Sequence, residues 1–264
     1  MSRVKTMSVC GAIALFASLA LARVHPFGDA GLYAAKGAKT PMLSHSGVPV
    51  EVRAVLVDQC ASCHSNEPNA PVYGHFAPAS WLMERDIVKA RQAMNFSLWE
   101  SYSADRQQTL AAMIAQETKS HQMPPEQYRL MHWNARPRDV DLRILGRWAH
   151  GPQAMQADTT IAGDADPERG EALFEKRCIG CHALTQNRKG PRLQGVYGRT
   201  SGTAEGFTYS GALKSAQIVW DQTSLGKWLA DPDALIPGND MDFVVSKPQE
   251  RRDLISYLKQ SSGK

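Results

Sequence analysis

Residues 60–64 read CASCH and residues 178–182 read CIGCH, so one chain carries the same C-x-x-C-H motif twice. Of its five cysteines, four belong to these motifs and the fifth, Cys10, lies in an apolar N-terminal run. Three chemistries use such cysteine pairs: a disulfide framework, a four-cysteine metal site and covalent haem attachment. Only haem attachment needs a histidine directly after each second cysteine.

The other two chemistries fit poorly. Two disulfides would be sparse for an exported protein of this size, and pairs 118 positions apart do not suggest one zinc site. In haem attachment, two thiols on a helical turn reach the two vinyl groups and the next histidine binds the iron. The sequence therefore predicts two covalently bound c-type haems. The predicted attachment residues are Cys60, Cys63, Cys178 and Cys181, with His64 and His182 as iron ligands.

The first 22 residues form a separate segment. Arg3 and Lys5 precede an apolar run from Met7 to Ala22, which ends in a small-x-small cleavage pattern. This order is typical of a secretory signal peptide. An uncleaved anchor is the alternative, because the run is only slightly shorter than a membrane span. We expect the rest of the chain in the periplasm, soluble or anchored to the outer face of the cytoplasmic membrane.

The charge of the chain limits its partners. The formal net charge is +4, and about +2 without the N-terminal cations. This small charge is shared almost evenly between the halves, so it gives no support for a nucleic-acid partner. We expect redox proteins or membrane respiratory complexes as partners.

The pattern of the remaining sequence favours an all-α protein. Few runs alternate apolar and polar residues, and β-branched residues rarely cluster. The stretch HGPQAMQADTTIAGDADP at residues 150–167 is small and polar, as linkers are. We expect two small helical c-type haem domains, residues 23–150 and 167–264, joined by a polar linker at residues 151–166. They follow the signal peptide or anchor of residues 1–22.

The C-terminal domain begins and ends with predicted amphipathic helices. One starts at Pro167 with Asp166 as N-cap. The other, RRDLISYLK, carries an apolar face that should pack against the first helix. After His182 the chain has one methionine, Met241, and no further histidine. Met241 lies in LIPGNDMDF, after a Pro-Gly turn that can hold a loop against a haem, and is the candidate sixth ligand.

Five segments of this domain follow in order the landmarks of mitochondrial-like class I cytochromes c: GEALFEKRCIGCHAL, GPRLQGVYGR, FTYSGALKSAQIVW, SLGKWLADPDALIPGNDM and ERRDLISYLK. The domain resembles that family over nearly its whole length. The resemblance implies the cytochrome c fold, His182 and Met241 as axial ligands, and a hydrogen bond from His182 to the Pro191 carbonyl. It also implies that Tyr209 and Trp220 lie near the haem, although simple aromatic packing would explain them too.

A closed His/Met iron favours outer-sphere electron transfer over chemistry at the metal. The resemblance further implies a basic ring that docks acidic partners. The cations compatible with it are Arg188, Lys189, Arg192, Arg199, Lys214 and Lys227. An ordinary solvated surface is the alternative, because four acidic residues between positions 231 and 242 add opposing charge.

The N-terminal domain is predicted to use different helices. Val52, Val55 and Leu56 recur at helical spacing before CASCH, and further helices are expected from Ser80, as N-cap, from Ser103, and over DVDLRILGRWA. The order CASCHSNEP, HFAPASW, QAMNFSLW and QMPPEQY resembles a c-type family described as a haem-binding domain. The resemblance spans most of this domain.

The sixth ligand of the N-terminal haem has several candidates: Met83, Met94, Met113, Met123, Met131, His75, His121 and His132. We predict Met123, because the prolines of its M-P-P stretch keep the segment out of a helix and present the thioether. Met94 and Met113 lie in helical patterns typical of core residues. The alternatives are His121 or His132, then an open position.

These features together favour a dihaem electron carrier that is not an enzyme. It would pass single electrons between a membrane quinol-oxidising complex or dehydrogenase and a terminal oxidase or reductase. The alternative is a peroxidase-like dihaem enzyme with an open N-terminal iron as its catalytic site. A third hypothesis is a haem sensor or a docking subunit of a membrane complex. The sequence shows no signalling module for a sensing role.

Overall fold

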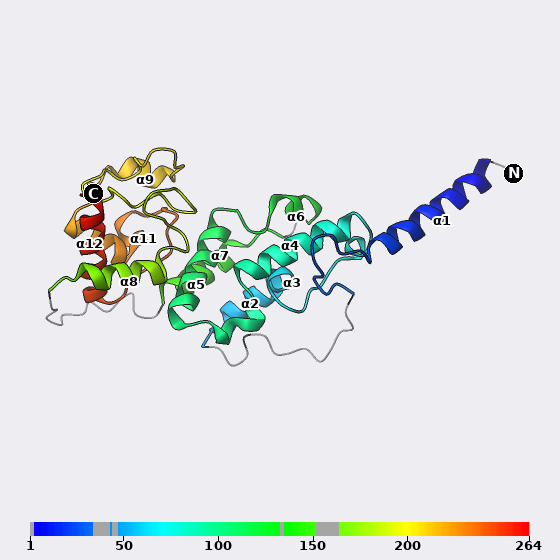
Figure 1. Ribbon diagram of the computed structural model, residues 1–264, viewed down its shortest axis with the longest axis horizontal. Coiled ribbons are helices and arrows are strands. Elements are labelled where there is room, and N and C mark those ends of the chain that lie inside the picture. The colour runs from blue at the N-terminus through cyan, green and yellow to red at the C-terminus, as the bar shows by residue number, and fades with distance from the viewer. Residues whose placement is uncertain (1–2, 34–42, 44–46, 133–134, 152–163, 264) are drawn as a thin grey trace. The chain divides into compact units, whose positions relative to one another are not determined.

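The computed structural model describes residues 3–33, 43, 47–132, 135–151 and 164–263 (Figure 1). Within them the chain forms twelve α-helices and two 3-10 helices and no strand, apart from one isolated bridge between Thr200 and Val219. The predicted all-α class is confirmed. Most of the predicted linker, residues 152–163, lies outside the described residues. The chain divides by its contacts into two units, Met1–Tyr102 and Ser103–Lys264.

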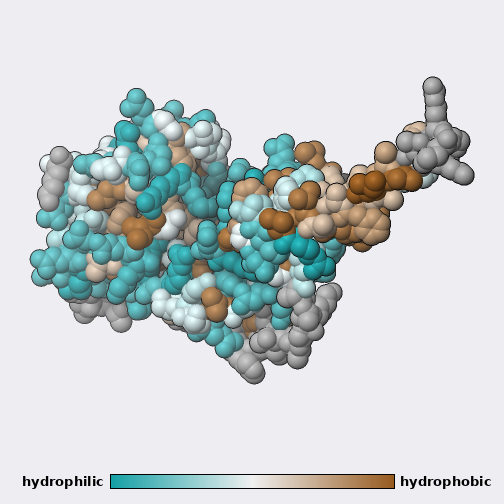
Figure 2. Space-filling model, turned by 45° about the vertical axis from the view of Figure 1, so that its right-hand side comes forward, coloured by the Kyte–Doolittle hydropathy of each residue, from teal (hydrophilic) through white to brown (hydrophobic). Residues whose placement is uncertain are grey.

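The first unit begins with α1 (Arg3–Leu21), whose apolar side chains cover its surface (Figure 2). Ile13 and Phe16 are 63% and 71% exposed. At the end of the helix the Trp81 indole donates to the Leu21 carbonyl at 3.0 Å. No helix in the described ranges is long and apolar enough to cross a membrane.

The remaining helices of the first unit surround the first C-x-x-C-H motif. They are α2 (Val50–Gln59), α3 (Ala61–His64), η1 (Val72–His75), α4 (Ala79–Ala93) and η2 (Phe96–Ser101). The predicted apolar face of α2 is buried at Val52, Val55 and Leu56. The motif spans the end of α2 and all of α3, and α3 packs against α4. The motif is thereby fixed on packed helices.

One predicted cap in this unit is wrong. Ser80 lies in the first turn of α4, and Pro78 takes the N-cap position. The Ser80 side chain is fully buried and its hydroxyl has no hydrogen-bond partner. Pro78 already has helical backbone angles (φ −87°, ψ −4°), so the restricted φ of proline starts the helix without a side-chain cap.

The second unit contains eight helices in its described part. They are α5 (Ala104–Lys119), α6 (Glu126–Met131), α7 (Asp139–His150), α8 (Pro167–Arg177), α9 (Gly211–Ala216), α10 (Gln222–Ala230), α11 (Pro232–Leu235) and α12 (Pro248–Ser262). Ser103 caps α5 by accepting from the Arg106 amide, and Asp166 caps α8 by accepting from two backbone amides. The Asp166 cap and a helix starting near Ser103 were predicted, and both are confirmed.

The first and last helices of the C-terminal domain, α8 and α12, pack against each other as predicted (Figure 1). The ring of Phe174 lies 5.5 Å from that of Tyr257, and Leu254 is buried beside them. A Cβ at Gly170 would collide with the Asp253 carbonyl. Glycine therefore permits the close crossing of the two helices.

Candidate functional site

The second C-x-x-C-H motif forms a turn at the end of α8. Cys178 is the C-cap of the helix, and the His182 amide donates to the Cys178 carbonyl at 2.8 Å. Both cysteines are free, and together with His182 they line a cavity of about 770 Å³. Cavities of this size hold small ligands and cofactors.

His182 is held as a neutral metal ligand would be. Its Nδ1 lies 2.8 Å from the Pro191 carbonyl, which confirms the hydrogen bond that the resemblance implied. Burial lowers the pKa of His182, opposed by this bond. Nδ1 is therefore the protonated nitrogen and Nε2 keeps a lone pair for iron. A Cβ at Gly190 would collide with the ring, so a glycine is needed beside it.

Met241 lines the same cavity as His182. Its amide donates to Asn239 Oδ1 at 2.7 Å. The Asn239 side chain is fully buried, and its Nδ2 donates to Asp233 Oδ1 and the Ile236 carbonyl, both at 2.9 Å. Asn239 thus braces the loop that presents Met241, a role that the sequence pattern did not reveal.

The walls of the cavity are largely apolar and aromatic. Tyr209 and Trp220 both line it, in line with the resemblance. Trp220 is buried and its ring lies 5.3 Å from that of Trp228. Burial raises the pKa of Tyr209. Such walls limit water around a metal centre and tune its potential.

The first motif has a similar local geometry. His64 Nδ1 lies 3.2 Å from the Met94 carbonyl, and the ring packs 6.0 Å from that of Phe96. Burial lowers the pKa of His64 and raises that of Cys60 to about 12. Met94 itself is buried, as its helical pattern indicated. Its carbonyl plays the part that Pro191 plays for the second motif, which the sequence did not indicate.

A buried orphan group shows that the first motif fits haem. Arg91 Nε donates to the Ser65 carbonyl at 2.7 Å, directly after His64. Its Nη2 is buried and has no hydrogen-bond partner, and burial lowers the pKa of Arg91. A buried guanidinium nitrogen requires an acceptor, and the propionate of a haem is a carboxylate of the kind that Arg binds.

The predicted sixth ligand of the N-terminal haem remains a prediction. Met123 lies outside any helix, between α5 and α6, and is 38% exposed. It belongs to the second unit, whereas Cys60, Cys63 and His64 belong to the first. Within the first unit, Met83 packs into the same small apolar cluster as Cys63.

Two of the histidine candidates lie in the second unit. His132 stacks on Tyr128 with ring centroids 4.1 Å apart, and its Nδ1 lies 3.1 Å from the Tyr128 carbonyl. His121 is exposed and has a positive φ of 58°.

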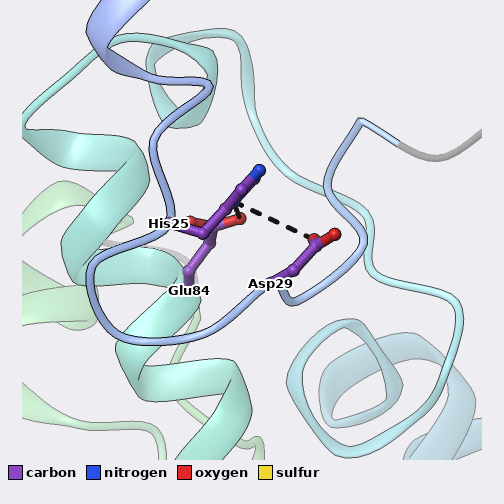
Figure 3. A group of neighbouring side chains, drawn as sticks. All are labelled: His25, Asp29 and Glu84. Carbon is purple, nitrogen blue, oxygen red and sulfur yellow. Dashed lines mark hydrogen bonds and ion pairs between the residues drawn. The ribbon is translucent and has the colours of Figure 1, made fainter.

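A separate cluster in the first unit joins His25, Asp29 and Glu84 (Figure 3). His25 Nδ1 lies 2.7 Å from Glu84 Oε1 and 4.0 Å from Asp29 Oδ1. Glu84 is fully buried on α4. A carboxylate buried without a partner has a large desolvation cost, and the contact with His25 offsets part of that cost. The cluster connects the segment after α1 to α4.

Comparison with known proteins gives the family. The haem-binding domain family matches residues 29–151 and the cytochrome c family matches residues 167–262. Cytochrome c of Chlamydomonas reinhardtii is 45% identical over 102 residues, which are 37% of this chain and 91% of that protein. The chain belongs to the cytochrome c family. Both resemblances inferred from the sequence are confirmed.

Other relatives match a similar share of this chain. Cytochrome c of Euglena viridis is 47% identical over 97 residues, covering 36% of the chain and 95% of that protein. A solved structure, cytochrome cH from Methylobacterium extorquens, is 42% identical and covers 36% of the chain and 99% of its own, with a TM-score of 0.35.

The two families account for the predicted cofactors. A haem-binding domain and a cytochrome c domain each carry one C-x-x-C-H motif, so the protein has two covalently bound c-type haems. Its general activity is electron transfer by a c-type cytochrome. The individual attachment and ligand residues named above remain predictions from motif and geometry.

Proposed function

We propose that this cytochrome is an exported dihaem electron carrier rather than an enzyme. It accepts single electrons from a membrane quinol-oxidising complex or a periplasmic dehydrogenase and delivers them to a terminal oxidase or reductase. Its location is the periplasm, with the segment of residues 1–22 acting as a signal peptide or as a tether. The exposed apolar surface of α1 supports this location.

The observation that carries the proposal is the placement of His182 and Met241 around one cavity. A covalently bound haem supplies a reversible one-electron couple at its iron. The residues around it do the rest: Pro191 orients His182, Asn239 holds the Met241 loop, and aromatic side chains limit water. A site closed on both sides favours electron transfer over binding of a substrate at the metal.

A spectrum of the reduced holoprotein with and without carbon monoxide tests the proposal, because carbon monoxide binds only to an open or labile iron. A carrier with both irons closed shows c-type bands that do not change with the gas. Rapid binding of carbon monoxide by one haem would contradict the proposal that both irons are closed.

The second candidate is a dihaem enzyme whose N-terminal iron is open. It is favoured by one observation: the side chain of Met123, the predicted ligand, is 38% exposed. Peroxide-dependent oxidation of an added electron donor by the purified holoprotein would support this candidate, and its absence together with an unchanged spectrum would support the carrier.

A further inference from the structure

Helix α5 packs against α8 inside the second unit. α5 belongs to the part matched by the haem-binding domain family, and α8 leads into the CIGCH motif of the cytochrome c domain. The cavity behind that motif is lined by Thr109, Ala112 and Gln116 of α5 as well as by Cys178 and Cys181. A helix from one family domain thus completes the haem site of the other.

Two ion pairs connect α5 to the cations beside the motif. Arg177 binds Asp105 with Nη2 to Oδ1 at 2.6 Å, and the Arg177 side chain is only 13% exposed. Lys189 pairs with Glu117, whose side chain is 17% exposed. Both acids lie on α5. Arg177 directly precedes Cys178 and Lys189 lies eight positions after Cys181, so the charges of the two surfaces are complementary.

The apolar contact between the surfaces is close. A Cβ at Gly180, inside CIGCH, would lie 2.9 Å from Thr109 Cγ2 and 3.6 Å from Met113 Sδ. Cys181 Sγ lies 3.9 Å from Gln116 Oε1. Farther along the same surface, Gln108 donates to the Val244 carbonyl at 3.0 Å. Close packing and paired charge together are the features of a specific interface.

We propose that α5 is a built-in docking partner for the haem-attachment face of the cytochrome c domain. Its carboxylates, Asp105 and Glu117, form ion pairs with Arg177 and Lys189, so these cations are not free to bind a separate acidic redox protein. Lys189, assigned from the sequence to a docking ring, is therefore used within the chain. This inference rests on the proposed electron-carrier function and names the partner of that face.

A zero-length cross-link tests the contact directly. Carbodiimide treatment of dilute, full-length holoprotein joins a carboxylate to an amine only where the two touch. We expect an intramolecular Glu117–Lys189 link in the peptide map, and its loss in Glu117→Gln. A monomeric product without that link, or a link formed only between chains, would overturn the proposal.

Charge variants test the consequence for electron transfer. Oxidation of the reduced holoprotein by hexacyanoferrate(III), an anion, is followed by stopped flow. Glu117→Lys breaks the pair and frees Lys189, so the rate constant should rise about tenfold at low salt and the gain should fall as salt is added. The double variant Glu117→Lys with Lys189→Glu restores the pair and should return the rate to that of the natural protein.

The matched control is Glu175→Lys. Glu175 is exposed on α8 and the substitution changes the net charge equally, without touching the α5 contact. Equal acceleration by Glu175→Lys and Glu117→Lys would contradict the proposal, because charge alone would then explain the effect. Binding of carbon monoxide by the reduced C-terminal haem would instead contradict the proposed carrier function. That result would leave the cross-link, and with it the α5 contact, unaffected.

Discussion

Asn239, whose side chain is fully buried, braces the loop of the predicted ligand Met241 through three hydrogen bonds: its Nδ2 donates two and its Oδ1 accepts one from the Met241 amide. Asn239→Ala removes all three and leaves the Met241 amide and Asp233 without this partner. We expect a loss of about 1–3 kcal/mol in unfolding free energy and a labile Met241. Thermal unfolding and carbon monoxide binding by the reduced holoprotein measure the two effects.

Asn187→Ala is the control for that variant. Asn187 also braces a loop, by donating to the Glu205 carbonyl and accepting from the Arg192 amide. It should lower stability without opening the iron. Carbon monoxide binding in both variants, or in neither, would contradict the role assigned to Asn239.

Met123→Ala tests the sixth ligand of the N-terminal haem. We expect this variant to open the iron, so that one haem of two binds carbon monoxide. Met83→Ala is the paired variant, because Met83 is the methionine that the structure packs with Cys63 in the first unit. A spectrum unchanged by Met123→Ala but altered by Met83→Ala would show the assignment to be wrong.

Residues that carry chemistry could be predicted from sequence where the motif names them. C-x-x-C-H identifies both histidines, and elimination leaves Met241 after His182. The supporting groups could not be predicted, because they act through the backbone or through burial. The Met94 carbonyl holds His64, and Arg91 keeps one nitrogen unpaired. A carbonyl has no sequence signal, and the fold alone decides which groups are buried.

Among the helices, the crossing of α8 and α12 depends on Gly170. Gly170→Ala places a methyl group against the Asp253 carbonyl, so we expect a loss of about 1–3 kcal/mol by overpacking. Gly146 in α7 has open space around its Cα, and Gly146→Ala should instead stabilise its helix by up to about 1 kcal/mol. Chemical denaturation measures the unfolding free energies of the two variants. Equal changes would show that the crossing of α8 and α12 does not depend on glycine at position 170.

The end of α7 makes a pH-dependent contact. Interaction with the Asp242 carboxylate raises the pKa of half-buried His150, with Asp233 and Asp231 adding to the effect and burial opposing it. Lys119 pairs with the same two aspartates, Asp233 and Asp242. A raised pKa stabilises the fold fully below the unfolded value near 6.5, and this contribution is lost as pH rises through the folded value.

We therefore expect the melting temperature to fall, as the pH rises above 6.5, by more in the natural protein than in His150→Gln. The difference between the two curves isolates the histidine from other titrations. Parallel curves would mean that His150 contributes no pH-dependent stability.

Helix boundaries could mostly be predicted because their signals are local. Ser103 and Asp166 supply caps, and apolar spacing marks the buried faces of α2 and α12. Ser80 is the exception: the sequence offers a good cap, but Pro78, two residues earlier, takes the N-cap position. The restricted φ of Pro78 therefore decided where the helix begins, and the capping preference of serine did not.

For the whole molecule, the family domains and the contact units differ. The haem-binding domain family extends to residue 151, while the contacts divide the chain after Tyr102 and group α5 to α7 with the cytochrome c domain. Sequence motifs identify two haem domains, because each motif is local. They do not show that a helix of the first family domain packs on the second, since that depends on paired charges distant in sequence.

The central claim is that one chain holds two covalently attached haems, one at each motif. Thioether bonds survive denaturation, so the intact mass of the denatured holoprotein counts the haems directly. We predict two haems per chain, and one in each of two variants, Cys60→Ser with Cys63→Ser and Cys178→Ser with Cys181→Ser. A single haem in the natural protein, or a count unchanged by either pair of substitutions, would contradict it.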